Sequence, residues 1–306
     1  MYKDRLQLAM QQMGLFGLSN LTGKGVTIAL LDSGVYEHPD LIGKVSGWHD
    51  FLMDSNQRQD PYGHGTHLAS LMVGSGTSQS SFAGLAPSAS LWMMRVLNHE
   101  GVGREQHIVE ALQWMLHNHK RYQIQIVNLS LGTMVDTVWY RDPICITARA
   151  LWRSGVVVVA PAGNEGSKGQ GNIRAPGLTP EIITVGSLAI DGTIAPFSSW
   201  GIGDQPPHKP DLLAPGEDVI GARVPDSYLD RLYPKRRVST HYMAQSGTSV
   251  STALVSATVA LLLEKEPHLT PDAVKARLQG ACVDLGLPQY VQGAGKLWLP
   301  ALFGLI

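Results

Sequence analysis

Short, uninterrupted apolar runs recur along the chain, and residues typical of turns bound them. Runs of this length that are rich in valine, isoleucine and leucine are typical of strands buried on both faces of a sheet. The pattern predicts such strands at 26–31, 91–96, 124–129, 156–160, 182–185 and 211–214.

Longer segments with helical patterning lie between most of these runs. They predict helices at 64–73, 105–119, 142–153, 248–264 and 271–279. Thr270 stands just before the last segment, where its hydroxyl can cap the first turn. Apolar strands that alternate with helices indicate an α/β fold, in which a mostly parallel central sheet carries helices on both faces.

The order of these elements shows no internal repeat, low-complexity tract or linker, so one large domain is expected. Segments 163–171 and 201–210 are interpreted as surface loops of that domain. Residues 1–22 are expected to form an N-terminal extension packed on a body at 23–306. The extension presents apolar side chains at helical spacing, namely Leu6, Met10, Met13 and Leu15.

Composition narrows the class of protein. A hydrophobic fraction of 44% against 16% charged residues supplies a buried core for a 306-residue chain. The formal net charge is −1, and the basic residues are scattered apart from Lys235-Arg236-Arg237, so nucleic acid is not an expected partner. The longest apolar run, 252–263, is too short and too rich in Ser and Thr to span a bilayer, so no membrane segment is expected.

The positions of the two cysteines give an indication of the cellular compartment in which the protein works. Cys145 and Cys282 lie far apart in the sequence and match no metal-ligand pattern. We interpret them as buried free thiols, with a disulfide between them as the alternative. The N-terminal stretch holds no unbroken apolar segment of the kind that a secretion signal needs. These features favour a cytoplasmic protein, with secretion as the alternative if a signal and a prodomain precede the sequence.

Asp32, His64 and Ser249 each stand in a glycine-punctuated setting. Asp32 follows the first predicted strand, His64 begins a predicted helix, and Ser249 lies at the start of the longest one. In parallel sheets, sites form at the carboxyl ends of strands, which is where Asp32 falls. A carboxylate, an imidazole and a hydroxyl are the groups that nucleophilic catalysis uses to orient a base, remove a proton and attack.

Each of these residues also has another interpretation. Asp32 could cap a turn, and Ser249 could cap a helix. His64 and His67 have the i, i+3 spacing of a metal-binding pair, but no HExxH glutamate or recognisable third ligand accompanies them. The sequence therefore predicts no metal at this place.

Further short motifs surround the three residues. In chain order they are His38-Pro39-Asp40-Leu41, Gly63-His64-Gly65-Thr66-His67, Gly84-Leu85-Ala86-Pro87, Asn128-Leu129-Ser130-Leu131-Gly132, Gly163-Asn164-Glu165-Gly166, Phe197-Ser198-Ser199-Trp200-Gly201, Lys209-Pro210-Asp211 and Gly247-Thr248-Ser249. Together they resemble the subtilisin-like (subtilase) family of serine proteases, from about Thr22 to about Gln279. The resemblance implies a single-domain subtilisin-like fold, with the peptidase catalytic domain at 23–306.

By this resemblance, Ser249 is the nucleophile, His64 is the general base and then the acid, and Asp32 orients the imidazole. Asn164 matches the family's oxyanion-hole asparagine, which would act with the backbone N–H of Ser249. A structural asparagine in a glycine-rich turn is the alternative for Asn164. The resemblance implies no cofactor for the chemistry.

The resemblance also implies where a substrate would lie. A protease must hold its peptide extended, and an exposed edge can take that peptide as an added strand. The substrate-binding residues implied are Ser130, Leu131, Gly132, Gly101, Gly103 and Gly163. Ordinary turn glycines are the alternative for Gly101 and Gly103.

Two further positions concern specificity and calcium. Arg174 falls near the floor of the pocket for the side chain before the cut bond, where many family members have a small residue. Its guanidinium could bind a substrate carboxylate, or it could point to solvent or pair with Glu165 and leave an apolar preference. Asp40 matches a frequent calcium ligand of the family, but the segment 75–81 lacks the side chains by which such a site could be recognised. The sequence therefore neither predicts nor excludes a structural Ca²⁺.

The sequence therefore predicts a serine endopeptidase that forms an acyl-enzyme and is either degradative or specific for a precursor. Its expected partners are peptide or protein substrates, and we expect a monomer. The alternative is a catalytically inactive peptide-binding module on the same fold. An α/β-hydrolase esterase is disfavoured because Gly247-Thr248-Ser249-Val250-Ser251 is not GxSxG.

Overall fold

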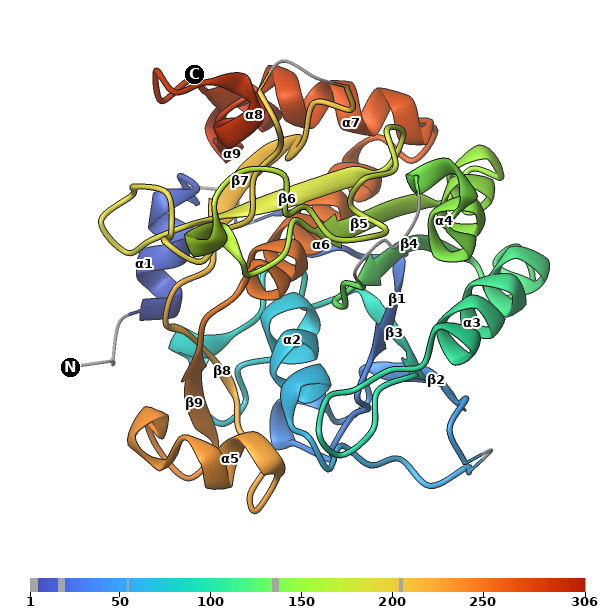
Figure 1. Cartoon of the computed structure of the whole chain (residues 1–306). Helices are drawn as coiled ribbons and strands as arrows, with labels where there is room; N and C mark the ends of the chain where they lie inside the picture. The colour runs from blue at the N-terminus through green and yellow to red at the C-terminus, as the bar shows by residue number, and fades with distance from the viewer. Residues whose placement is uncertain (1–4, 16–19, 54, 134–137, 204–205, 306) are drawn as a thin grey trace.

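A nine-stranded sheet forms the centre of the molecule (Figure 1). The computed structural model describes residues 5–15, 20–53, 55–133, 138–203 and 206–305. The strand order is β10-β11-β7-β6-β5-β4-β1-β3-β2, and only β10 and β11 pair antiparallel. The strands are β1 (Thr27–Asp32), β2 (Val45–Asp50), β3 (Ser90–Arg95), β4 (Ile124–Leu129), β5 (Val157–Pro161), β6 (Ile183–Leu188), β7 (Leu212–Pro215), β10 (Cys282–Val283) and β11 (Lys296–Leu297).

The six predicted strands are confirmed as β1 and β3 to β7, with ends that shift by a few residues. β2 was missed because its positions mix buried, half-buried and exposed side chains, which gives no apolar run. A separate antiparallel hairpin of β8 (Val219–Ala222) and β9 (Tyr242–Gln245) was also missed, because its short strands lie outside any long apolar run.

The five predicted helices are confirmed with nearly the predicted bounds. They are α2 (His64–Val73), α3 (Glu105–Asn118), α4 (Pro143–Arg153), α6 (Thr248–Lys265) and α7 (Pro271–Gly280). The N–H of Ala273 donates to the Thr270 hydroxyl at 3.2 Å, so Thr270 caps α7. The N–H of Cys145 donates to the Asp142 carboxylate at 2.9 Å, so Asp142 caps α4 and lies just outside it. Four short helices complete the set: α1 (Arg5–Gln12), α5 (Tyr228–Leu232), α8 (Gln289–Gln292) and α9 (Leu299–Phe303).

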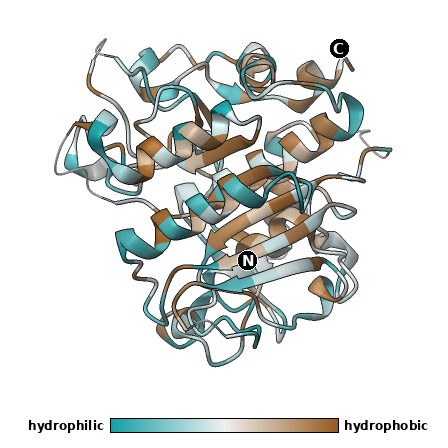
Figure 2. Ribbon diagram, turned by 90° about the vertical axis from the view of Figure 1, so that its right-hand side faces the viewer, coloured by the Kyte–Doolittle hydropathy of each residue, from teal (hydrophilic) through white to brown (hydrophobic). Residues whose placement is uncertain are grey.

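Helical layers cover the two faces of the sheet. α2 and α6 pack together on one face, and α3 and α4 pack together on the other (Figure 1). Every residue of α6 up to Leu263 is buried, as predicted for a core helix. Figure 2 shows the hydrophobic residues concentrated in the sheet between these layers. Within the described ranges, no helix combines the length and apolarity that crossing a bilayer requires.

The predicted apolar face of the N-terminal segment is seen in α1 and the residues after it. Leu6 and Met13 are fully buried, and the side chain of Gln12 donates to the backbone oxygen of Ala189 at 3.2 Å. Met10 and Leu15 pack against the same core. Hydrophobic burial and a side-chain hydrogen bond thus hold this segment on the body.

The sheet topology positions the site. β5, β4, β1 and β3 are parallel neighbours, so their carboxyl ends meet at one edge. Asp32 ends β1, Ser130 follows β4, and Ala162-Gly163-Asn164 follows β5. The amino ends of α2 and α6 bring His64 and Ser249 to the same edge.

Candidate active site

Asp32, His64 and Ser249 form one hydrogen-bonded chain. Nδ1 of His64 lies 2.9 Å from Oδ2 and 3.0 Å from Oδ1 of Asp32, and Nε2 of His64 lies 2.9 Å from Oγ of Ser249. Asp32 is fully buried, whereas the His64 side chain is 15% exposed and faces the cleft. With Nδ1–H directed at the carboxylate, Nε2 is the nitrogen left to accept the proton of the serine hydroxyl.

A second buried carboxylate supports this arrangement from behind. The Ser33 hydroxyl lies 3.0 Å from Oδ1 of Asp32 and 2.7 Å from Oδ1 of Asp60, and it accepts the N–H of Gly65 at 3.0 Å. Asp60 also accepts hydrogen bonds from the N–H and the hydroxyl of Thr66. These bonds tie the end of β1 to the start of α2, which fixes Asp32 relative to His64.

The charges around His64 tune its pKa. Burial by itself lowers the pKa of this imidazole, but the charge and hydrogen bond of Asp32 and the charge of Asp60 outweigh burial and raise the pKa above 6.5. The raised pKa makes Nε2 a stronger base, which suits the removal of a hydroxyl proton.

The alternative role of His64 and His67 as a metal-binding pair is not favoured. Both ring nitrogens of His64 face protein partners, Asp32 and Ser249. His67 is fully buried, and burial together with the charge of His64 lowers its pKa to about 3. Among the described residues, no group of three or more His, Cys, Asp or Glu side chains could hold a metal ion.

Asn164 lies after β5 and faces the start of α6. Its Oδ1 accepts hydrogen bonds from the N–H of Thr248 at 2.9 Å and from the Thr248 hydroxyl at 3.0 Å. With Oδ1 held in this way, Nδ2 carries the donors available to another acceptor. A Cβ on Gly247 would lie 3.3 Å from Oγ of Ser249 and 3.4 Å from Nδ2 of Asn164, so the absent side chain keeps the space between these two groups open.

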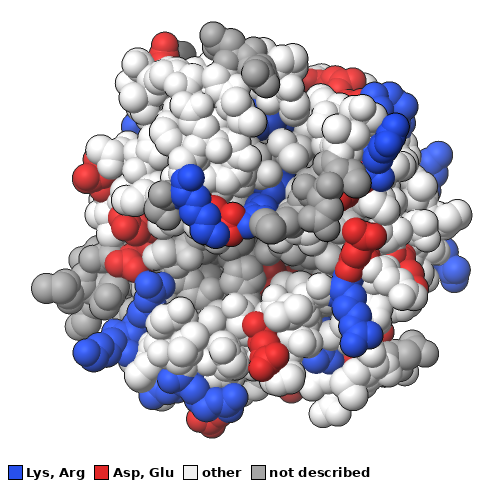
Figure 3. All heavy atoms as spheres, viewed as in Figure 1, with Lys and Arg blue, Asp and Glu red and all other residues white. Residues whose placement is uncertain are grey.

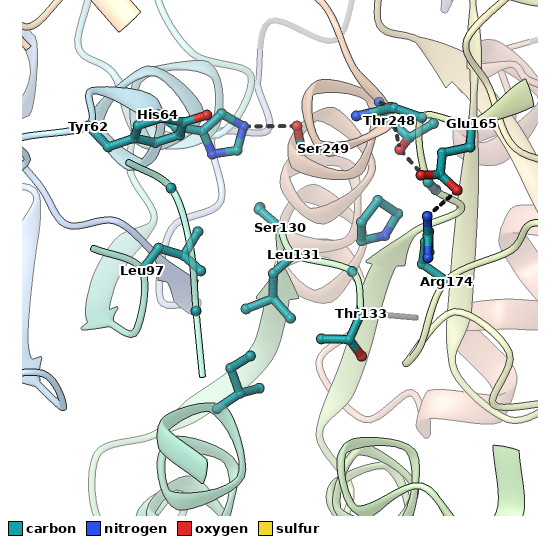
Figure 4. A pocket seen from close by; sticks show the side chains of 17 residues that line it. Tyr62, His64, Leu97, Ser130, Leu131, Thr133, Glu165, Arg174, Thr248 and Ser249 are labelled. Carbon is teal, nitrogen blue, oxygen red and sulfur yellow. Dashed lines mark hydrogen bonds and ion pairs between the residues drawn. The ribbon is translucent and has the colours of Figure 1, made fainter. Parts of the chain in front are cut away.

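The predicted site residues gather around one cleft with a volume of about 530 Å³. Figure 3 shows the face of the molecule that carries it, hollowed near the middle. All of the predicted catalytic and substrate-binding residues line the cleft except Asp32, which is fully buried. Figure 4 shows His64 and Ser249 facing each other at this cleft. Lining residues that were not predicted include Tyr62, Leu97, Ile108, Thr133, Pro161 and Thr248.

Arg174 pairs with Glu165 at the side of this cleft (Figure 4). The Arg174 side chain is 15% exposed, and Lys168 Nζ contacts the other carboxylate oxygen of Glu165 at 3.1 Å. Hydrogen bonds from Arg174 and Lys168 lower the pKa of Glu165. Of the interpretations offered for Arg174, the structure shows the ion pair with Glu165.

The stem of Arg174 fills the gap between two backbone segments of the cleft. A Cβ on Gly132 would lie 2.7 Å from Cβ of Arg174, and a Cβ on Gly163 would lie 2.8 Å from its Cγ. Gly163 also has φ +113°, which side chains rarely adopt. Both glycines are therefore needed where the arginine passes between them.

Tyr62 is a cleft residue for which the sequence offered no signal. Its ring lies 6.1 Å from the His64 ring, and a Cβ on Gly101 would lie 2.4 Å from its Cζ. Burial, followed by the charge of Asp32, raises the pKa of Tyr62 to about 12, so its hydroxyl stays neutral. The close approach of ring and backbone explains why position 101 is a glycine.

Asp40, which matches a frequent calcium ligand of the family, is held by protein donors in this structure. One carboxylate oxygen accepts the N–H of Ser78 at 2.8 Å, and the other accepts the Tyr242 hydroxyl. Burial and the charge of Asp40 raise the pKa of Tyr242, so this hydroxyl stays a donor. Each carboxylate oxygen of Asp40 thus accepts one protein donor.

Comparison with known proteins agrees with this geometry. Residues 23–295 match the model of the subtilase family. The chain is 40% identical over 277 residues to serine protease AprX of Bacillus subtilis (strain 168), covering 85% of this chain and 61% of AprX. It is 33% identical over 268 residues to subtilisin E of the same organism, covering 87% of this chain and 62% of that protein. This chain thus spans about three fifths of the length of these relatives.

Solved structures give the same picture. The structure titled sphericase superposes with a TM-score of 0.81 at 28% identity, covering 97% of this chain and 98% of sphericase. A cold-adapted subtilisin-like serine proteinase superposes with a TM-score of 0.71 at 26% identity, covering 91% of this chain and 88% of that one. The α/β architecture with a mostly parallel sheet is therefore shared with subtilisin-like proteinases.

Proposed function

Because this chain belongs to the subtilase family of serine proteases, we propose that it is a serine endopeptidase whose catalytic residues are Asp32, His64 and Ser249. The observation that carries the proposal is the hydrogen-bonded chain from Asp32 through His64 to Oγ of Ser249. This is the arrangement that a hydroxyl needs to attack a carbonyl carbon.

In the first half of the reaction, Oγ of Ser249 attacks the carbonyl carbon of the scissile bond while Nε2 of His64 takes its proton. The carbonyl oxygen becomes an oxyanion, which Nδ2 of Asn164 and the backbone N–H of Ser249 stabilise. The C–N bond then breaks, and His64 returns the proton to the leaving amine. An acyl-enzyme ester on Ser249 remains.

In the second half, a water molecule takes the place of the leaving amine. His64 removes a proton from this water, the resulting hydroxyl attacks the ester, and the proton returns to Oγ of Ser249. Asp32 stays ionised throughout and stabilises the imidazolium that forms in each half. No cofactor enters either step.

The cleft supports binding of an extended peptide. Two segments line it, one with Ser130, Leu131 and Gly132 and the other with Gly101 and Gly103. We infer that the substrate enters between these segments as an added strand, held by backbone hydrogen bonds. Such binding tolerates many side chains, which suits a degradative enzyme, whereas a precursor-specific enzyme needs contacts outside the cleft.

We further propose a cytoplasmic monomer that acts on peptides or proteins, with residues 1–22 as an extension of the catalytic domain at 23–306. Both cysteines are free thiols in the structure, Cys145 buried and Cys282 half-buried, which supports a reducing compartment. Secretion is the alternative. Fractionation of cells with an antibody against the chain separates the two.

The test of the function is digestion of casein by the wild type and by Ser249→Ala, read by mass spectrometry. The variant should keep its fold and lose about 10⁶ in kcat, the magnitude typical of removing a triad nucleophile. A fluorophosphonate probe should label the wild type at Ser249. An unlabelled wild type that binds casein without cutting it would show the inactive peptide-binding module instead.

A further inference from the structure

The chain between β8 and β9 forms a basic excursion that the active site does not use. The excursion, residues 223–241, contains α5 and the short 3-10 helix Pro234–Arg236. It includes the one basic run of the sequence, Lys235-Arg236-Arg237. Its cationic residues are Arg223, Arg231, Lys235, Arg236 and Arg237, against the acidic residues Asp226 and Asp230.

One buried carboxylate fixes the shape of this excursion. Asp230 is fully buried and binds both Arg223, whose Nη2 lies 2.8 Å from Oδ2, and Arg237, whose Nε lies 2.8 Å from Oδ1. Burial raises the pKa of Asp230, but the donors from Arg223, the Asp226 backbone and Arg237 outweigh burial and lower the pKa to about 2. Arg223 and Arg237 are thus structural, and the excursion is held in one conformation.

The other cations, Arg231, Lys235 and Arg236, are not held by Asp230. Nη1 of Arg231 donates to the backbone oxygen of Asp226 at 2.6 Å, and Arg236 is half-buried. Arg231 and Lys235 are exposed, and the guanidinium of Arg236 lies 4.9 Å from the centre of the Tyr233 ring. In the described part of the chain, no carboxylate forms an ion pair with Arg231, Lys235 or Arg236. Leu232 beside them is 51% exposed. Cations mixed with exposed apolar groups are what a binding surface presents to an acidic peptide.

The excursion is joined directly to the catalytic cleft. The N–H of Tyr228 donates to the oxygen of Pro61 at 2.9 Å, and the N–H of Leu229 donates to the oxygen of Tyr62 at 3.1 Å. The rings of Tyr228 and Tyr62 lie 5.8 Å apart, and Tyr62 lies beside His64 in the cleft. Figure 3 shows Lys and Arg side chains at the lower left, where Figure 1 places α5 and β9.

We propose that this excursion is a second substrate-binding surface, on which Arg231, Lys235 and Arg236 bind an acidic segment of the polypeptide being cut. The inference rests on the proposed endopeptidase function. The occupant is a polypeptide because the surface adjoins the cleft that would hold the scissile bond. Three cations on a chain of net charge −1 are too few for the stripe that nucleic acid requires.

The test uses three peptides that share one cleavable core without charged residues. One has a neutral tail of Gln and Asn on both ends, and the other two replace one tail, at the amino or the carboxyl end, with Glu and Asp. At low salt, one acidic peptide should be cut with kcat/KM about three- to tenfold above the neutral peptide, because each exposed ion pair contributes modestly. The preference should vanish in 0.5 M salt, where screening is strong.

The double variant Lys235→Glu/Arg236→Glu should lose the preference, with kcat/KM for the neutral peptide unchanged. The matched control is Lys120→Glu/Arg121→Glu, a second basic pair, in which both residues are exposed and Arg121 also lies near a tyrosine ring. These residues precede β4, so they lie at the amino end of that strand, whereas the site lies at the carboxyl ends of the strands. The control should therefore keep the preference for the acidic peptide.

Equal cutting of all three peptides by the wild type would overturn the proposal, while cutting of the neutral peptide would still support the endopeptidase. Loss of the preference in the Lys120/Arg121 control would also overturn it, because a general charge effect would then be the cause. In Ser249→Ala, the acidic peptide should bind more tightly than the neutral one. Tighter binding of RNA or of anionic vesicles than of the acidic peptide would assign the surface to another partner.

Discussion

Thr248 holds Asn164 by two hydrogen bonds to the same atom, from its N–H at 2.9 Å and from its hydroxyl at 3.0 Å. The Thr248 hydroxyl also accepts the N–H of Gly163 at 3.1 Å. The amide of Asn164 therefore cannot turn over without losing both bonds. Preorganised donors of this kind stabilise an oxyanion without reorganising as it forms.

Asn164→Ala should lower kcat by about 10² to 10³ with KM little changed, because the amide meets the oxyanion only as charge develops. Steady-state kinetics on a neutral peptide measures both quantities. A change mainly in KM would instead show a substrate-binding or structural role for Asn164.

Thr248→Val should lower kcat by about two- to tenfold, since the isosteric change removes one of two bonds that hold the amide. Thr258→Val is the matched control, because Thr258 lies in the same helix and its hydroxyl donates to the backbone oxygen of Leu254 at 2.9 Å. Equal losses in the two variants would mean that the helix, not the amide, is affected.

The rate should rise with pH as His64 loses its proton. A general base must be neutral to accept a proton, and the pKa of His64 is raised, so activity is lost as pH falls through a midpoint above 6.5. The measurement is kcat/KM from pH 5 to 9, and a flat profile would exclude His64 as the base.

Asp32→Asn should lower kcat by about 10⁴, because the imidazole loses its orienting carboxylate.

Arg174 should not select acidic side chains while Glu165 neutralises it. We expect peptides with Leu before the cut bond to be preferred over peptides with Glu. Glu165→Gln should raise the Glu/Leu ratio of kcat/KM by about tenfold, because the guanidinium is then free to pair with substrate. Lys168→Gln, at the exposed end of the same cluster, is the control and should leave the ratio close to that of the wild type. An unchanged ratio in Glu165→Gln would show that Arg174 does not contact the substrate side chain.

Chelation should leave the protein as stable as before, since Tyr242 and Ser78 already bind the carboxylate of Asp40. The expected change in melting temperature with a calcium chelator is below about 1 °C. A melting temperature that rises with calcium concentration would show that the protein binds calcium, and Asp40→Asn would tell whether the Asp40 carboxylate is one of the ligands.

Much of this molecule follows from local patterns. The apolar runs around Ile28 and Val127 mark buried strands because helices cover both faces of the sheet to which these strands belong. Asp142 and Thr270 mark helix starts because a short oxygen-bearing side chain satisfies the first free N–H groups. β2 could not be predicted from such patterns, because its buried, half-buried and exposed positions give no hydrophobic periodicity in the sequence.

The residues of the active site can also be separated into those that the sequence predicted and those that only the structure revealed. The roles of Asp32, His64 and Ser249 were predicted from the resemblance of many short motifs to the subtilase family, because each residue by itself also fitted a capping or metal-binding role. The hydrogen bonds between the three residues span 32 and 185 positions, so only the tertiary structure brings them together.

The partners of Arg174 and Asp40 were decided only in three dimensions. Arg174 could have reached solvent, substrate or Glu165, and its passage between Gly132 and Gly163 is what brings it to the glutamate. Asp40 binds a hydroxyl 202 positions away, on the hairpin that the sequence did not show. Sequence by itself determined which segments are buried and which groups could react, because burial and turn chemistry act over a few residues. The tertiary structure decided which charges are neutralised, because that depends on distances between segments that no local pattern encodes.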